Sequence, residues 1–380
     1  MPGKQGYPGD TALALGGHYV LARSANSDLL NQAGRAKKLV PDLVFRCSDY
    51  STDDEAVQAA IDALPDASGK VVLSEGIFTL AASLLIATGR PLTLVGQGRG
   101  ITTLILADDV DDHIIKPAGA VTGCKFEDFT LDGNKDNQSA GAGISYDDMV
   151  HVTTFRVEAK NCKAAGFGGA TSHTITDGLW IDCLAHDNDT FGFIIGLTSD
   201  RCRLIVCTAE DNGSLGIALD GCVDSMVLAC TSLGNTDDGI EIFSATRNKV
   251  IGCTSLNNGS KGIDVATGGT DVLIADNIVN GNSGLGIDRG ISSSTVVRNN
   301  IGHVTEKSGT ATLVNGQTSI AVTHGLAVTP VAGDIMVTPI ESWGNALKFW
   351  ISAYSSTTFT ITVDQDPGAD VDFAWKAIVL

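Results

Sequence analysis

Residues 216–220, 239–243 and 262–266 read Gly-Ile-Ala-Leu-Asp, Gly-Ile-Glu-Ile-Phe and Gly-Ile-Asp-Val-Ala, and these stretches decide the fold. A Gly-Ile or Gly-Phe pair recurs seven times along the chain. Its glycines are spaced by 23 to 26 residues, and they are Gly143, Gly166, Gly192, Gly216, Gly239, Gly262 and Gly286. A nearly constant period of this length is typical of a solenoid, in which every coil repeats the environment of the coil before it.

Alternation inside the repeat distinguishes a parallel β-helix from a leucine-rich repeat. Each copy has few leucines, no helical stretch separates the copies, and apolar residues alternate with period 2. This pattern predicts strands that stack in parallel, about 4.8 Å apart. The side chains one and three places after each glycine are predicted to point inward: Ile217, Leu219, Ile240, Ile242, Ile263 and Val265. Arg289 breaks this rule, so we expect the solenoid to end near it.

Two further residue types recur at fixed distances before these glycines, and each forms a column of equivalent positions in successive coils. Four residues before the glycine stand Asn188, Asn212, Asn235, Asn258 and Asn282. Inward asparagines in successive turns can bond one another and satisfy turn amides that stacking would bury. Nine residues before the glycine stand Cys183, Cys207, Cys230 and Cys253, followed by Asn277. A continuous run of four cysteines favours buried thiols over disulfides.

Composition and charge exclude several classes of function. The chain has 380 residues, 44 glycines and only 18% charged residues, which suits an all-β protein of one long domain with small additions. Its net charge of −19 argues against nucleic acid as a partner. No apolar run reaches the length of a membrane helix, and the first residues do not resemble a secretory signal. We therefore expect neither a membrane partner nor a recognisable signal peptide.

Three regions are predicted along the chain. Residues 1–45 are weakly patterned and are expected to be irregular. Residues 46–308 are predicted to form the solenoid, with a helix near residues 52–64 that begins with a Thr52–Glu55 capping box and plugs the first coil. Residues 309–380 contain about six longer alternating strands, which predict a small β-sandwich. Its tryptophans either form a core or stack on sugar rings: Trp343, Trp350 and Trp375.

Several segments carry a family resemblance. Residues 54–62 (Asp-Glu-Ala-Val-Gln-Ala-Ala-Ile-Asp), 69–73 and 95–98 resemble the entry segment of the pectate-lyase-like right-handed parallel β-helix superfamily. Residues 126–137 (Phe-Glu-Asp-Phe-Thr-Leu-Asp-Gly-Asn-Lys-Asp-Asn) and 185–188 (Ala-His-Asp-Asn) are most similar to the catalytic modules of mannuronan C-5 epimerases. The C-terminal region resembles small sandwiches of phage tail proteins. These resemblances imply a polysaccharide partner and an extracellular or virion-associated location, and they are compatible with a homotrimer.

The catalytic motif of the epimerases is not kept. That motif reads Tyr-Gly-Phe-Asp-Pro-His-Glu, and Gly166-Phe167 matches its Gly-Phe. Ala165, Gly168 and Ala170 then stand at the Tyr, Asp and His positions. Because C-5 chemistry needs a base and an acid at these places, the resemblance does not imply epimerase activity here. His173 is near in sequence, but nothing places it at the His position of the motif.

Acidic residues accumulate further along the chain. In the family that this chain resembles, catalytic side chains stand two and four places after the glycine. These places hold four acids that we predict to be catalytic: Asp220, Glu241, Asp264 and Asp288. Stacked carboxylates repel one another, which raises at least one pKa and suits a general acid. Glu241 and Asp264 would lie near the 5 Å spacing of retaining glycosidases, and skipping one coil approaches the wider spacing of inverting ones.

Neighbouring residues complete the predicted site. Those predicted to bind substrate are Asp237, Asp238, Phe243, Arg247, Lys261 and Arg289, with Phe191 as a further aromatic side chain. The alternative interpretations are a solvated acidic surface and a Ca²⁺ or substrate-contact site. No cofactor is required by the proposed chemistry, although Ca²⁺ is compatible with the acids. His186 is interpreted as a turn residue rather than a base, and residues 132–134 as a structural turn.

The functional hypothesis is a polysaccharide depolymerase that uses carboxylate acid–base chemistry in an exposed groove. One alternative is a lyase or C-5 epimerase-like enzyme on a uronate polymer such as alginate or pectate. The other alternative is a non-catalytic glycan-binding or structural component of a phage tail. In all three hypotheses, the polysaccharide partner is inferred from the resemblance to proteins of the same fold.

Overall fold

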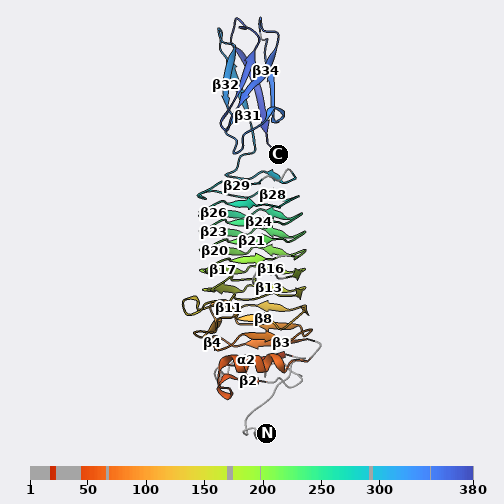
Figure 1. Cartoon of the computed structure of the whole chain (residues 1–380), viewed down its shortest axis with the longest axis vertical. Coiled ribbons are helices and arrows are strands. Elements are labelled where there is room, and N and C mark those ends of the chain that lie inside the picture. The colour runs from red at the N-terminus through yellow and green to blue at the C-terminus, as the bar shows by residue number, and fades with distance from the viewer. Residues whose placement is uncertain are drawn as a thin grey trace, which may run out of the picture.

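The computed structural model describes residues 18–22, 44–65, 68–168, 174–196, 198–290, 294–342 and 344–379. They form a long stack of parallel β-coils, followed by a small antiparallel domain (Figure 1). The predicted all-β fold class, with a β-solenoid, one α-helix at its start and a sandwich at its end, is confirmed.

Three parallel sheets form the sides of the solenoid. Sheet 1 has twelve strands, in the order β2 (Val44–Arg46), β1 (His18–Ala22), β3 (Gly69–Leu73), β6 (Leu92–Val95), β10 (Lys125–Glu127), β13 (Thr153–Phe155), β16 (Leu179–Ile181), β19 (Arg203–Ile205), β22 (Met226–Leu228), β25 (Lys249–Ile251), β28 (Leu273–Ala275) and β30 (Val296–Arg298). Sheet 2 has eight strands: β4 (Gly76–Leu80), β7 (Thr102–Leu106), β11 (Thr130–Asp132), β14 (Glu158–Lys160), β17 (Leu184–His186), β20 (Thr208–Glu210), β23 (Thr231–Leu233) and β26 (Thr254–Leu256).

Sheet 3 contains the glycine repeat. Its five strands are β18 (Phe193–Ile195), β21 (Ile217–Asp220), β24 (Ile240–Phe243), β27 (Ile263–Val265) and β29 (Ile287–Asp288). Single bridges through Ile144 and Phe167 extend it toward the N-terminus. Shorter ladders pair β5 (Leu84–Ile86) with β8 (Ile115–Pro117), and β12 (Met149–Val150) with β9 (Val121–Thr122) and β15 (Ile175–Thr176). Short 3-10 helices span Cys47–Asp49, Lys135–Asn137 and Ala332–Asp334.

The inward positions predicted after each glycine are confirmed. Ile217, Leu219, Ile240 and Ile242 are all 0% exposed and belong to one continuous core. Burial of these side chains removes apolar surface from water, at roughly 25 cal/mol for each Å². Because every coil repeats the pattern, the core runs the length of the solenoid.

The asparagine column is a hydrogen-bonded ladder, as predicted. The Nδ2 of Asn188 donates to Oδ1 of Asn212, that of Asn212 to Asn235, and that of Asn235 to Asn258, each at 2.9 Å. The Oδ1 of Asn235 also accepts the backbone N–H of Asn212. Nine free cysteines lie among the described residues, and the predicted column of buried thiols is confirmed.

The glycine column is explained by the approach of the next coil. A Cβ added at Gly239 would lie 2.0 Å from Oγ of Ser255, 2.6 Å from Nδ2 of Asn258 and 2.7 Å from the carbonyl oxygen of Gly262. No other residue fits at such distances. Stacking of the coils therefore requires glycine at this point of each repeat.

The N-terminal region differs from the prediction in two ways. Residues 1–45 were expected to be irregular, but β1 and β2 extend sheet 1 beyond β3. The helix α2 (Asp53–Asp62) packs beside them at the start of the stack, as expected (Figure 1). The capping box is wrong, because Thr52 makes no side-chain cap and Glu55 accepts the N–H of Ser51 instead.

The C-terminal domain is a sandwich of two three-stranded antiparallel sheets. One sheet contains β31 (Glu306–Leu313), β36 (Val371–Ile378) and β33 (Ile335–Pro339), and the other contains β32 (Ser319–Thr323), β35 (Thr358–Val363) and β34 (Phe349–Tyr354). Its apolar core is separate from that of the solenoid. Trp375 is 7% exposed and packs in this core, whereas Trp350 is 46% exposed, and Trp343 lies outside the described residues.

Candidate functional site

A pocket of about 270 Å³ opens on the outer face of sheet 3. It spans three neighbouring strands, β18, β21 and β24, and we call it the sheet 3 pocket. Its lining residues are Phe191, Ile194, Ser214, Leu215, Ala218, Leu219, Asp220, Asp237, Glu241 and Phe243. Three of the acids and both aromatic residues discussed from the sequence therefore meet at one place.

Sheet register determines how the predicted catalytic acids are arranged. Glu241, Asp264 and Asp288 stand opposite one another on β24, β27 and β29, in one outward column. Asp220 is not in this column, because it pairs with Phe243. It lies on β21, the strand next to that of Glu241, two residues after Ala218, which is the residue directly opposite Glu241. With strands about 4.8 Å apart and a rise of about 3.3 Å per residue, the Cα atoms of Asp220 and Glu241 are about 8 Å apart.

Glu241 has the most perturbed carboxyl of the sheet 3 pocket. Burial and the negative charges of Asp238, Asp264, Asp237 and Asp220 together raise its pKa to about 7. This carboxyl thus holds a proton in a large fraction of molecules at neutral pH. Burial also raises the pKa of Asp220, and one of its carboxylate oxygens, Oδ1, is buried with no hydrogen-bond partner.

Asp264 and Asp288 form a separate group around Lys261. The Nζ of Lys261 lies 3.0 Å from Oδ2 of Asp264 and 2.9 Å from Oδ2 of Asp288. Asp264 is only 6% exposed, and burial raises its pKa against the opposing effect of Lys261. Despite its partial burial, Asp288 has a lowered pKa, because Lys261 and the N–H of Gly290 stabilise its charge. Neither aspartate lines the sheet 3 pocket.

The other residues predicted to bind substrate lie in different places. Asp237 and Phe243 line the sheet 3 pocket, and Phe243 is 42% exposed. Asp238 is buried beneath the rim, where its Oδ1 accepts the N–H of Lys261. The guanidinium of Arg247 is held by both oxygens of Asp224, on the turn that leads to sheet 1. Arg289 follows Asp288 in the last coil, away from the pocket lining.

An apolar floor was missed by sequence reasoning. Ile194, Leu215 and Ala218 are 5%, 6% and 4% exposed, although Ile194 and Ala218 occupy the outward column of sheet 3. They form a small cluster with Ala142 and Ala165, apart from the solenoid core. The sequence does contain a signal for this floor. If the outward column of Glu241 is followed toward the N-terminus, its next two positions are the apolar residues Ala218 and Ile194.

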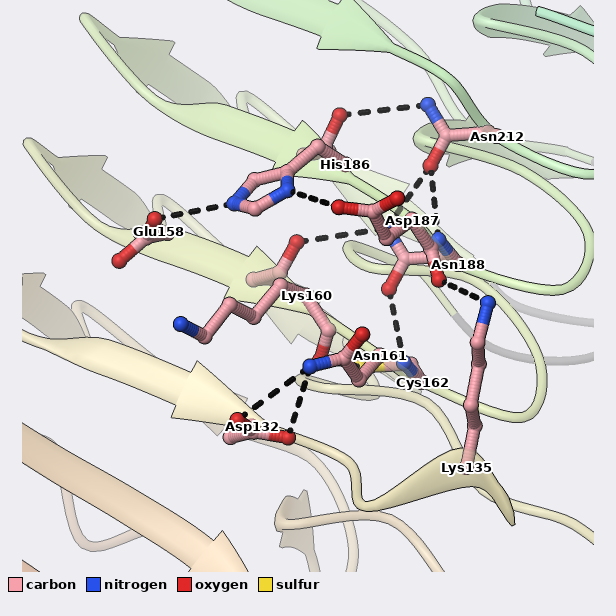
Figure 2. Close-up of polar contacts among 12 residues, drawn as sticks. Asp132, Lys135, Glu158, Lys160, Asn161, Cys162, His186, Asp187, Asn188 and Asn212 are labelled. Carbon is pink, nitrogen blue, oxygen red and sulfur yellow. Dashed lines mark hydrogen bonds and ion pairs between the residues drawn. The ribbon is translucent and has the colours of Figure 1, made fainter.

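A second polar cluster lies on the outer face of sheet 2 (Figure 2). His186 is at the end of β17, not in a turn as predicted, and its ring lies between two carboxylates. Its Nε2 is 3.0 Å from Oε1 of Glu158, and its Nδ1 is 2.7 Å from Oδ2 of Asp187. The hydrogen bond with His186 lowers the pKa of Glu158 to about 2 and raises the pKa of His186. No sequence signal singled out Glu158.

Polar contacts below this cluster stabilise the turns that follow sheet 2. The backbone N–H of Asn134 donates to Oδ1 of Asp132, which supports the predicted turn at residues 132–134. The Nζ of Lys135 donates to the carbonyl oxygen of Asp187, two coils away (Figure 2). The cluster and the contacts below it therefore link several coils.

Within the residues that the structure describes, no group of three or more His, Cys, Asp or Glu residues is arranged to hold a metal ion. No described helix is long and apolar enough to cross a membrane.

Comparison with known proteins agrees with the observed coils. A family model described as a right handed beta helix region matches residues 114–301, which covers sheet 3 and the sheet 3 pocket. The matched coils are thus similar to the right-handed β-helix family. This match confirms the resemblance to right-handed parallel β-helices that was drawn from the sequence.

A curated protein and two solved structures are similar to this β-helix. Mannuronan C5-epimerase AlgE3 of Azotobacter vinelandii is 32% identical over an alignment of 180 residues, and the alignment covers 40% of this chain and 10% of that protein. The chain thus spans about a tenth of that relative's length. The A-module of mannuronan C-5 epimerase AlgE6 of the same organism has a TM-score of 0.55 at 20% identity, covering 67% of this chain and 79% of the module. ORF18 of Geobacillus virus E2 has a TM-score of 0.57 at 16% identity, covering 89% and 79%. Both structures share the fold.

The epimerase motif remains unmatched in this β-helix. Ala165 is buried at 2% exposure, and Gly168 has a φ of 117°, a conformation that favours glycine over the aspartate of the motif. Ala170 and His173 lie outside the described residues. Ala165 and Gly168 supply no acid or base, and the acids of sheet 3 lie further along the stack.

Proposed function

We propose that this β-helix is a glycan-active enzyme that hydrolyses a polysaccharide in the sheet 3 pocket. The observation that carries the proposal is Glu241, a carboxyl with a pKa raised to about 7 at the wall of an open pocket. A carboxylic acid that keeps its proton near neutral pH is the group that a glycosidase uses to protonate its leaving group. Two phenylalanines of the lining, Phe191 and Phe243, suit the apolar face of a sugar ring.

The proposed reaction uses Glu241 as the acid and Asp220 as the base. Glu241 donates its proton to the glycosidic oxygen as the bond between that oxygen and the anomeric carbon breaks. A water molecule attacks the anomeric carbon, and Asp220 takes the proton that the water loses. Glu241 ends ionised and Asp220 ends protonated, and exchange of one proton with solvent restores both.

We propose inversion at the anomeric carbon, because Asp220 is offset by two residues from the position opposite Glu241. Inverting glycosidases place their carboxyls about 6.5–9.5 Å apart, to leave room for the water, and retaining ones about 5–5.5 Å apart. The offset places the Cα atoms of Asp220 and Glu241 about 8 Å apart, rather than the about 4.8 Å of residues directly opposite each other. Asp264, which the sequence pointed to as the partner of Glu241, is paired with Lys261 and acts on Glu241 through its charge.

That the substrate is a polysaccharide rests on similarity. Proteins that resemble this chain in sequence or fold are named for mannuronan, and we take from them the general class of polysaccharides and not the particular polymer. Epimerisation and β-elimination are disfavoured for this chain because Ala165 and Gly168 replace two reactive residues of the epimerase motif. An extracellular or virion-associated location, a homotrimer and bound Ca²⁺ stay predictions.

Hydrolysis is tested by incubating the protein with a panel of neutral and acidic polysaccharides. We expect new reducing ends without a rise in absorbance at 235 nm, and an inverted anomer as the first product seen by NMR. Glu241→Gln and Asp220→Asn should each lower the rate at least 100-fold, because general acid–base catalysis contributes about 10²–10⁴-fold. Glu210→Gln, on the outer face of sheet 2, is the matched control and should keep the wild-type rate.

The other outcomes separate the alternatives. A rise at 235 nm would assign lyase chemistry. Binding without any product would assign a non-catalytic glycan-binding protein. Full activity of the Glu241→Gln variant would show that the acid lies elsewhere.

A further inference from the structure

We propose that the sheet 3 pocket selects an uncharged stretch of glycan and rejects uronate and sulfated polymers. This inference rests on the proposed function, and it names the substrate class of the same site. Its basis is the combination of an acidic rim without a cation and an apolar floor.

The lining of the sheet 3 pocket carries charge of one sign only. Asp220, Asp237 and Glu241 are its ionisable residues, and no lysine, arginine or histidine lines it among the residues that the structure describes. Buried carboxylates of Asp238 and Asp264 lie behind the rim and add to the negative potential felt by Glu241. A polymer with a carboxylate or sulfate on each unit would meet like charges that have no local counter-ion.

Two cations that the sequence suggested for substrate binding are already engaged. Lys261 is held between Asp264 and Asp288, and Arg247 is held by both oxygens of Asp224. Releasing either cation to a substrate would leave a carboxylate unpaired, and Asp264 is almost completely buried. The net charge of −19 adds to the repulsion over longer range.

The floor of the sheet 3 pocket favours an uncharged ring. Ile194, Leu215 and Ala218 present apolar atoms there, and Phe191 and the half-exposed Phe243 also line the pocket. An uncharged pyranose has C–H faces that pack on such atoms. A carboxylate seated there would lose water and gain no hydrogen-bond donor from these side chains.

Carboxylates on the rim can still serve a neutral sugar, because they accept hydrogen bonds from its hydroxyl groups. Asp220 and Asp237 bring such carboxylates to the lining. Acidic and apolar parts of the pocket therefore favour the same ligand, with hydroxyl groups toward the acids and C–H groups toward the floor.

Binding is measured separately from cleavage, by affinity electrophoresis of the full-length Glu241→Gln variant. The gels contain a β-glucan, an α-1,3-glucan, a galactomannan, alginate or polygalacturonate. We expect retardation by at least one neutral polymer, and at least ~10-fold weaker retardation by both uronate polymers. Circular dichroism verifies the fold of the variant.

Two further variants test the location. Phe243→Ala, at an exposed side chain, should abolish the retardation by the neutral polymer, and the control Glu210→Gln should preserve it. Asp237→Lys, on the exposed rim, should strengthen retardation by alginate at least ~10-fold, because it places a cation where the wild type has an anion.

The outcomes distinguish this proposal from the proposed function. Retardation by alginate that is as strong as that by the neutral polymers at physiological salt, or no retardation by any neutral polymer, would overturn the inference. Cleavage of a uronate polymer by the wild type would overturn it while leaving hydrolysis intact. Neutral binding without cleavage would support the inference and overturn the proposed hydrolysis.

Discussion

At Glu241, burial and four neighbouring carboxylates act in the same direction. Each of them disfavours the charged form, so the pKa is raised to about 7. The repeat in the sequence could place Glu241 on the outside of its coil, next to Asp264. It could not reveal that Asp238 turns beneath the rim or that Lys261 pairs with Asp264 rather than with Glu241. Those contacts depend on turn conformations that a period does not specify.

The raised pKa of Glu241 predicts a pH-dependent stability. An unfolded glutamate has a pKa of about 4.3, so the folded state binds the proton more tightly. The stabilisation from this proton is complete below about pH 4.3 and is lost as pH rises through about 7. After allowance for solvent screening, we expect the loss to be about 1–2 kcal/mol.

Urea denaturation of the wild type and Glu241→Gln from pH 4 to pH 8 measures this loss. The variant should lack the part of the decline that belongs to Glu241, so the two curves should converge or cross as pH rises. Glu210→Gln is expected to follow the wild type. Parallel curves for Glu241→Gln and wild type would show that this carboxyl titrates normally.

At the scale of a single coil, the glycine and asparagine columns have one joint cause. Each turn packs so closely on the next that side chains of Ser255 and Asn258 occupy the space where Gly239 would carry a Cβ. The same Asn258 accepts a hydrogen bond from Asn235. The sequence predicted the asparagine ladder, because a repeated inward amide has few other roles. The steric reason for glycine appeared only in the stacked coils.

Gly239→Ala is therefore expected to destabilise the solenoid strongly. The new methyl group would lie 2.0 Å from Oγ of Ser255, and the ladder around Asn258 would have to shift. We expect a loss of about 2–4 kcal/mol, combining overpacking with a disturbed buried hydrogen bond. Thermal denaturation provides the measurement. Gly333→Ala, where no atom lies within 4 Å of the new Cβ, is the matched control, and equal stability of both variants would contradict this account.

For the whole molecule, two separate cores predict two units of unfolding. The solenoid core and the sandwich core share no residues. Cooperativity should therefore hold within each part more than between them.

Phe373→Ala should destabilise only the sandwich. Phe373 is 0% exposed in the C-terminal core, and truncation of a buried phenylalanine costs about 3–5 kcal/mol. Calorimetry should show one transition lowered and the other unchanged. Phe126→Ala, at a side chain that is 0% exposed in the solenoid, should do the reverse. A single transition that both variants shift equally would show that the two parts unfold together.

The sequence by itself determined the repeating coil, because each coil contacts mainly its neighbours and a fixed period places like residues in register. It thus predicted the inward column of Ile240 and Ile242, the asparagine ladder, the buried thiols and the outward position of Glu241. The tertiary structure decided which acids share a pocket. Asp220 lines the sheet 3 pocket from the strand next to that of Glu241, whereas Asp264 does not line it and forms an ion pair with Lys261. Burial, ion pairing and pKa depend on how turns and side chains pack in three dimensions, and this packing varies from coil to coil while the period does not.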